Sequence, residues 1–151
     1  MHSLGGKHVI VDAYDVHDDI FVKLSENKYD DFDLHVIKSF KNNHMTLLSK
    51  TINHFNQNGA VTALYLLSES HFSLHTWPEH NFISFDAFTY GKCNTEKFMN
   101  DVLNYIGSAN INKMVIDRGI QGSFNNVCDI STSHDISLSH DIEWAQNASL
   151  Q

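Results

Sequence analysis

Basic residues are scarce in this sequence. Its 151 residues contain ten Lys and Arg against eighteen Asp and Glu, which gives a formal net charge of -8 at pH 7. Proteins that bind nucleic acid neutralise phosphates with clustered Lys and Arg, and the basic residues here are scattered along the chain. We therefore expect no nucleic acid among the partners.

Cysteines and long apolar runs are also scarce. The two cysteines, Cys93 and Cys128, cannot form a disulfide framework and belong to no C-x-x-C pair. No run of about eighteen apolar residues occurs, and the opening MHSLGGK lacks the apolar core of a signal peptide. The sequence thus predicts a soluble cytoplasmic protein with reduced thiols and no membrane partner.

What the sequence does contain is typical of one folded domain. Hydrophobic residues make up 42% of the chain, whereas charged residues make up only 19%. We expect one domain over residues 1–119, followed at 120–151 by a loosely packed extension rich in Ser, Asn, His and Asp. The repeated Ser-His-Asp-Ile of this extension could form a metal site, but we expect no metal there because metal ligands usually lie on rigid elements.

Hydrophobic periodicity predicts two helices and several strands. Apolar residues recur at three- and four-residue spacing in 29–43 and 95–106, which is typical of amphipathic helices. Runs that are β-branched or alternate between apolar and polar residues predict strands at 7–14, 46–55, 61–67, 72–77, 82–89 and 114–116. Asn58-Gly59 predicts a hairpin turn between the second and third of these strands. This order predicts an α+β fold, a two-layer sandwich with helices on one face of a mainly antiparallel sheet.

One segment carries the residues suited to chemistry. Residues 67–91 have the sequence LSESHFSLHTWPEHNFISFDAFTYG. A hydrolase with Ser70 as nucleophile is one interpretation, but adjacent Ser and His are not expected to form a spatial triad, and no G-x-S-x-G turn surrounds them. A metal site of His71, His75 and Glu79 would need a helix, whereas the alternating pattern favours a strand. In the plainest interpretation these are strand residues beside a turn.

The segment resembles the processing region of the prokaryotic S-adenosylmethionine decarboxylase family. The family pattern is S-E-S-H, apolar, S/T, apolar, H-T/S-W/F-P-E, and then a strand with an aspartate that ends in T-C-G. ESHFSLHTWPE, followed by FDAFT and a glycine, is similar to this pattern. Ser3-Leu4-Gly5 with His8, and Arg118-Gly119, also resemble landmarks of the family in the same order. The resemblance covers about residues 3–119 and agrees with the predicted fold.

The resemblance implies an enzyme that makes its own cofactor. Decarboxylation of an α-amino acid leaves negative charge on the α-carbon, and no side chain can serve as the electron sink. In the family, a serine hydroxyl attacks the preceding carbonyl, and the cut chain carries a covalent pyruvoyl group whose ketone forms a Schiff base with the substrate amine. By this resemblance Ser70 is the pyruvoyl precursor and Glu69 its partner at the cleavage site. The products would be residues 1–69 and 70–151.

Four further residues match family positions. His75 matches the histidine that acts as acid or base in processing, and Thr62 falls near a serine whose hydroxyl supports that step. Glu79 matches the acid that accepts hydrogen bonds from the two ribose hydroxyls of the substrate. Phe55 lies near a phenylalanine that stacks on adenine, and an ordinary core position is the alternative for it.

One position departs from the family pattern. Tyr90 stands in Thr89-Tyr90-Gly91, where the family has the cysteine that donates the catalytic proton. A phenol has an unperturbed pKa of about 10 against about 8.5 for a thiol, and it is bulkier. We therefore expect Tyr90 or Cys93, three positions further on, to be the proton donor.

The resemblance also implies the substrate and the assembly. Glu79 favours S-adenosylmethionine, because a basic amino acid has no ribose to bind, and the product would be the aminopropyl donor of spermidine and polyamine biosynthesis. A pyruvoyl-dependent ornithine or arginine decarboxylase of the same family is the alternative. A non-catalytic binding or regulatory homologue is a second alternative, supported only by Tyr90. The resemblance further implies a homodimer of processed pairs with its sites near the subunit interface.

Overall fold

The structure is a computed structural model that describes residues 5–107 and 109–120. Cys128 and the predicted 120–151 extension, apart from Ile120, lie outside these residues. No helix in the described ranges is long and apolar enough to cross a membrane. The elements in chain order are β1 (Gly6–Tyr14), α1 (Asp18–Leu24), α2 (Tyr29–Asn42), β2 (Leu47–His54), β3 (Val61–Leu67), β4 (Ser70–Trp77), η1 (Pro78–His80), β5 (Phe82–Tyr90), α3 (Thr95–Ile106) and β6 (Asn110–Arg118).

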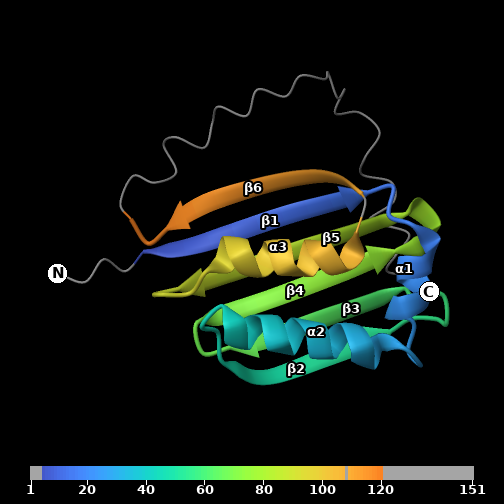
Figure 1. Cartoon of the computed structure of the whole chain (residues 1–151), viewed down its shortest axis with the longest axis horizontal. Helices are drawn as coiled ribbons and strands as arrows, with labels where there is room; N and C mark the ends of the chain where they lie inside the picture. Colours follow the sequence, from blue (N-terminus) through green and yellow to red (C-terminus); the bar gives the residue numbers. More distant parts are fainter. Residues whose placement is uncertain (1–4, 108, 121–151) are drawn as a thin grey trace, which may run out of the picture.

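The six strands form one sheet in the order β2-β3-β4-β5-β1-β6, and every neighbouring pair is antiparallel. Figure 1 shows α2 and α3 lying over the same face of this sheet. The predicted two-layer α+β sandwich is therefore confirmed. The last strand is longer than the predicted 114–116, because it pairs with β1 along its whole length.

The core lies between the helices and the face of the sheet that they cover. Alternate residues of each strand point to opposite faces, so Val9 and Val11 of β1 are fully buried while their neighbours are not. Phe40 of α2 stacks on Phe98 of α3 with ring centroids 4.8 Å apart, and Phe72 of β4 meets Phe98 edge-on at 5.0 Å. This aromatic cluster fixes β4 under both helices.

The predicted hairpin turn at Asn58-Gly59 joins β2 to β3. Gly59 has φ +86°, and a Cβ atom there would lie 2.2 Å from the carbonyl oxygen of Phe21 in α1. Only glycine fits this contact. The turn therefore fixes the end of the sheet that lies against α1.

Periodicity did not predict α1. Its seven residues are too few to display a helical period, and its N-cap is the His17 side chain, which accepts a hydrogen bond from the Asp19 amide at 3.3 Å. Ile20, Phe21 and Leu24 are buried, so tertiary packing stabilises this short helix.

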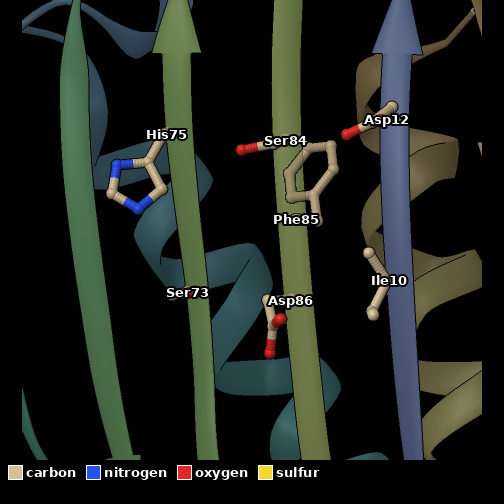
Figure 2. Close-up of a pocket in the computed structure, with 7 residues that line it drawn as sticks. All are labelled: Ile10, Asp12, Ser73, His75, Ser84, Phe85 and Asp86. Atoms are coloured by element: carbon tan, nitrogen blue, oxygen red, sulfur yellow. The ribbon is translucent and has the colours of Figure 1, made fainter. Parts of the chain in front are cut away.

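The opposite face of the sheet carries no helix among the described residues. We call it the open face. Leu64 and Leu66 of β3 lie on it with 52% and 53% of their surface exposed. Polar side chains of β1, β4 and β5 lie at its centre, and residues suited to chemistry are among them (Figure 2).

Candidate active site

The bond between Glu69 and Ser70 lies at the tip of the β3–β4 hairpin. Ser68 and Glu69 form a two-residue turn, and Leu67 pairs directly with Ser70 across it. Ser70 has φ +148°, in a region that residues other than glycine rarely adopt. Backbone strain of this kind is typical of functional positions.

Hydrogen bonds from two other segments hold Glu69. Its carbonyl oxygen accepts from the backbone amide of Tyr90 at 3.0 Å, and its carboxylate accepts from the backbone amide of Thr46 at 2.9 Å. The amide of Ser68 donates to the carbonyl of Thr46 at 2.9 Å. The Tyr90 amide thus polarises the carbonyl that a nucleophile would attack, in the manner of an oxyanion donor.

A Ser-His-Asp chain begins at Ser70. Its Oγ lies 3.1 Å from Nδ1 of His71, and Nε2 of His71 lies 3.3 Å from the carboxylate of Asp86 on β5. The expectation that adjacent Ser and His cannot join such a chain is wrong. The strained backbone of Ser70 lets its hydroxyl reach the neighbouring ring, and β5 supplies the acid from the next strand.

Two more residues extend this chain across the sheet. His8 of β1 places Nε2 at 2.9 Å from the Asp86 carboxylate, and its Nδ1 lies 3.1 Å from a guanidinium nitrogen of Arg118 on β6. The guanidinium also lies over the Phe88 ring, 4.4 Å from its centroid. Sequence reasoning considered His71 only as a ligand in the rejected metal site and assigned no role to Asp86. The alternation of β5 could have placed Asp86 on the open face, but only the strand order brings β1, β4 and β5 together.

Tyr90 and Cys93 both lie near the hairpin tip. Tyr90 ends β5 with 39% of its surface exposed. The Cys93 thiol donates to the His44 carbonyl at 3.2 Å, and burial raises its pKa, with a further increase from the Glu69 carboxylate. A raised pKa keeps the thiol protonated at neutral pH. The hairpin tip therefore has a protonated thiol near Glu69 and a half-exposed phenol at the end of β5.

His75 and Thr62 form a second group. They face each other on β3 and β4, with Oγ1 of Thr62 2.8 Å from Nδ1 of His75. Burial lowers the pKa of His75, so its ring is neutral at pH 7. A neutral imidazole held by a hydroxyl is suited to accepting a proton.

Glu79 and Phe55 lie beyond this second group. Glu79 is exposed on η1, which begins at Pro78 directly after β4. Phe55 follows β2 and is 68% exposed, so the alternative of an ordinary core position is wrong. An exposed ring and an exposed carboxylate at the end of a sheet are available to a ligand.

A single chain does not bring the two groups together. Ser70 and His75 lie on the same strand, and five residues of extended chain span about 16 Å. We call the surroundings of Ser70 the hairpin end of the sheet and those of His75 the far end. Every predicted site residue belongs to one of these two ends.

A pocket of about 240 Å³ on the open face lies between them. Figure 2 shows the sheet with the helices behind it, His75 toward one end of the pocket and Asp86 toward the other. The lining residues come from three adjacent strands and are Ile10, Asp12, Ser73, His75, Ser84, Phe85 and Asp86. The pocket thus connects the far end with the Ser-His-Asp chain of the hairpin end.

Comparison with known proteins gives one consistent result. The profile of the family described as S-adenosylmethionine decarboxylase matches residues 7–119. The S-adenosylmethionine decarboxylase proenzyme of Hydrogenobaculum sp. is 35% identical over 117 residues, which are 76% of this chain and 82% of that protein. S-adenosylmethionine decarboxylase proenzyme 2 of Bacillus anthracis is 36% identical over 122 residues, 80% of this chain and 92% of that protein.

A solved structure agrees with these sequence matches. The crystal structure of the adenosylmethionine decarboxylase from Aquifex aeolicus matches with a TM-score of 0.64 and 30% identity, over 76% of this chain and 91% of that one. Fold and sequence thus confirm the resemblance found in residues 67–91. The chain belongs to the S-adenosylmethionine decarboxylase family.

Proposed function

We propose that this protein is a self-processing S-adenosylmethionine decarboxylase. It cuts its own chain between Glu69 and Ser70 into residues 1–69 and 70–151, and Ser70 becomes a pyruvoyl group. The observation that carries the proposal is the hairpin tip, where a strained serine follows a carbonyl that a backbone amide already polarises. Membership of the family supports the same activity.

The chemistry of the cut needs only the chain and one water molecule. The Ser70 hydroxyl attacks the Glu69 carbonyl carbon, the C–O bond forms, and the C–N bond breaks to leave an ester and a free amine. Loss of the Ser70 α-proton then expels the Glu69 carboxylate and leaves a dehydroalanine. Water hydrolyses its imine form to the ketone and releases ammonia. The hydrogen bond from Tyr90 supports the first of these steps, because charge develops on the Glu69 oxygen.

Side chains at the far end of the sheet then bind the substrate, and side chains at the hairpin end take part in its decarboxylation. When present, the pyruvoyl group supplies the electron sink that decarboxylation of an amino acid requires. Glu79 binds the ribose hydroxyls and Phe55 stacks on the adenine, and their exposure supports both roles. Cys93 or Tyr90 returns a proton to the α-carbon after carbon dioxide leaves. The raised pKa of Cys93 supports the thiol as the donor.

We further propose a homodimer of processed pairs whose open faces pack together. About 16 Å of strand separates Ser70 from His75, which is too far for one chain to use both on one substrate. A twofold axis through the open faces would set the hairpin end of one protomer against the far end of its partner. The exposed Leu64 and Leu66 supply apolar surface for this contact.

The product would be decarboxylated S-adenosylmethionine, the aminopropyl donor of cytoplasmic polyamine synthesis. An ornithine or arginine decarboxylase is the second candidate. The observation that favours it is Tyr90, which places a bulky phenol where the family has cysteine.

Intact mass spectrometry of the purified protein tests the cut. We expect two chains, the longer of which begins with a ketone in place of Ser70. Release of carbon dioxide from S-adenosylmethionine, ornithine and arginine then identifies the substrate, and we expect S-adenosylmethionine alone to react. A single uncut chain with an ordinary serine would refute the proposal, and release from a basic amino acid alone would refute the assignment of Glu79.

A further inference from the structure

We propose that His71 is the base that takes the proton of the Ser70 hydroxyl in the first step of self-cleavage, and that Asp86 positions its ring. This inference rests on the proposed function and names the group that starts it. The chain from Ser70 through His71 to Asp86 carries the inference, with contacts of 3.1 Å and 3.3 Å.

The contacts of His8 and Arg118 determine which ring nitrogen of His8 carries its proton. A guanidinium can only donate hydrogen bonds, so Nδ1 of His8 must accept the one from Arg118. The proton of a neutral His8 ring is then on Nε2, which donates to Asp86 at 2.9 Å. The Asp86 carboxylate thus accepts the hydrogen bond of His8, and the Arg118 guanidinium fixes this direction from the other side of the His8 ring.

The contacts of His71 determine its tautomer in the same way. The Asp86 carboxylate accepts from His71 as it does from His8, so the proton of a neutral His71 ring lies on Nε2. Its Nδ1 then carries a lone pair, and this lone pair faces the Ser70 hydroxyl at 3.1 Å. Arg118 therefore sets the tautomer of His71 through two intermediates, and the result is a base aimed at the nucleophile.

The proton balance of the step closes within this group. The proton leaves Oγ of Ser70 for Nδ1 of His71 as Oγ bonds to the Glu69 carbonyl carbon. The same proton passes to the Ser70 nitrogen as the C–N bond breaks, so the ring is neutral again when the ester has formed. Asp86 stabilises the imidazolium that exists between these two transfers.

His75 belongs to a different step. In its own chain it lies about 16 Å from Ser70 along β4, beyond direct reach of the hydroxyl. Its neutral ring suits removal of the Ser70 α-proton, the step that follows the ester, across the dimer interface. Loss of His71 should therefore block ester formation, whereas loss of His75 should let the ester accumulate.

Cell-free synthesis followed by rapid purification tests this division. Cleavage of wild type, His71→Ala, Asp86→Asn and His75→Ala is followed by intact mass, with and without hydroxylamine at neutral pH, which cuts an ester. Hydroxylamine can also cut the Asn58-Gly59 peptide bond, so only fragments that end at residue 69 or begin at residue 70 are counted. We expect His71→Ala to cleave about 10²-fold more slowly and to release no fragment with hydroxylamine. Asp86→Asn should cleave about tenfold more slowly, because the ring loses one hydrogen bond to a charged partner. His75→Ala should release fragments with hydroxylamine in which Ser70 is intact.

Two controls distinguish the loss of a catalytic base at residue 71 from a general disturbance of the fold. His17 is also paired with an acid, Asp19, at 3.4 Å, but it lies in the exposed segment before α1, so His17→Ala should cleave like wild type. Added imidazole should accelerate cleavage of His71→Ala, which a purely structural role would not allow.

Three results would overturn the inference while the proposed function stands. They are cleavage of His71→Ala at the wild-type rate, release of a fragment from it by hydroxylamine, and failure of imidazole to accelerate it. A wild-type protein that stays uncut would instead refute the proposed function.

Discussion

The two ends of the sheet differ in how far the chain alone prepares them. At the hairpin end, hydrogen bonds from other segments hold the Glu69 carbonyl, the Glu69 carboxylate and the His71 ring. At the far end, His75 has one hydroxyl partner, while Glu79 and Phe55 are exposed. The groups proposed to start self-cleavage are thus preorganised, whereas Glu79 and Phe55, which are proposed to bind a substrate, are open to solvent.

Removal of the nucleophile at the hairpin end should have the largest effect. Ser70→Ala should abolish cleavage and decarboxylation together, because no other group can form the ester or the ketone. Intact mass and carbon dioxide release measure the two effects. Ser68→Ala changes the adjacent exposed turn residue and should still be cut. Residual decarboxylation by Ser70→Ala would mean that the electron sink lies elsewhere.

The proton donor gives the next largest effect. Cys93→Ser should slow turnover about 10²-fold if the thiol donates, whereas Tyr90→Phe should then change it little. Because burial and Glu69 raise the pKa of Cys93, the thiol keeps its proton to a higher pH than an ordinary cysteine. The alkaline loss of activity should accordingly begin above the usual thiol range of about 8.5. If neither variant slows turnover after normal cleavage, both assignments are wrong.

Mixing two inactive variants tests whether one site uses both ends. A Ser70→Ala protomer lacks the hairpin end but retains Glu79, and a Glu79→Gln protomer has the reverse defect. Random pairing makes half of the dimers mixed, and one of their two sites is complete, so co-expression should restore about a quarter of wild-type activity. Each variant alone should be inactive or nearly so. An absence of restoration in a verified mixed dimer would place each complete site within one chain.

Sequence patterns predicted two long helices and most of the sheet because periodicity or alternation persists over six or more residues in those elements, whereas only residues 114–116 of β6 were predicted. They did not predict α1, whose seven residues are stabilised by packing. The hairpin tip was found through Glu69 and Ser70, but the roles of Asp86, His8 and the Tyr90 amide were not. Those depend on strand order and register, and a backbone donor has no sequence signature.

The smallest expected effect is a change in the pKa of His75. Burial of the ring and the negative charges near it act on this pKa in opposite directions. Asp12 and Asp86 line the same pocket, and their charges would favour a protonated ring. Burial opposes them and lowers the pKa of His75, so its neutral form persists below the ordinary value of about 6.5. An NMR titration of the uncut Ser70→Ala protein should therefore find His75 less than half protonated at pH 6.5. Asp12→Asn should lower this pKa further by removing one negative charge, while the remote Asp19→Asn should leave it unchanged. A midpoint above the ordinary value would mean that the two carboxylates outweigh burial, and the ring would then be a proton donor near neutral pH instead of a base.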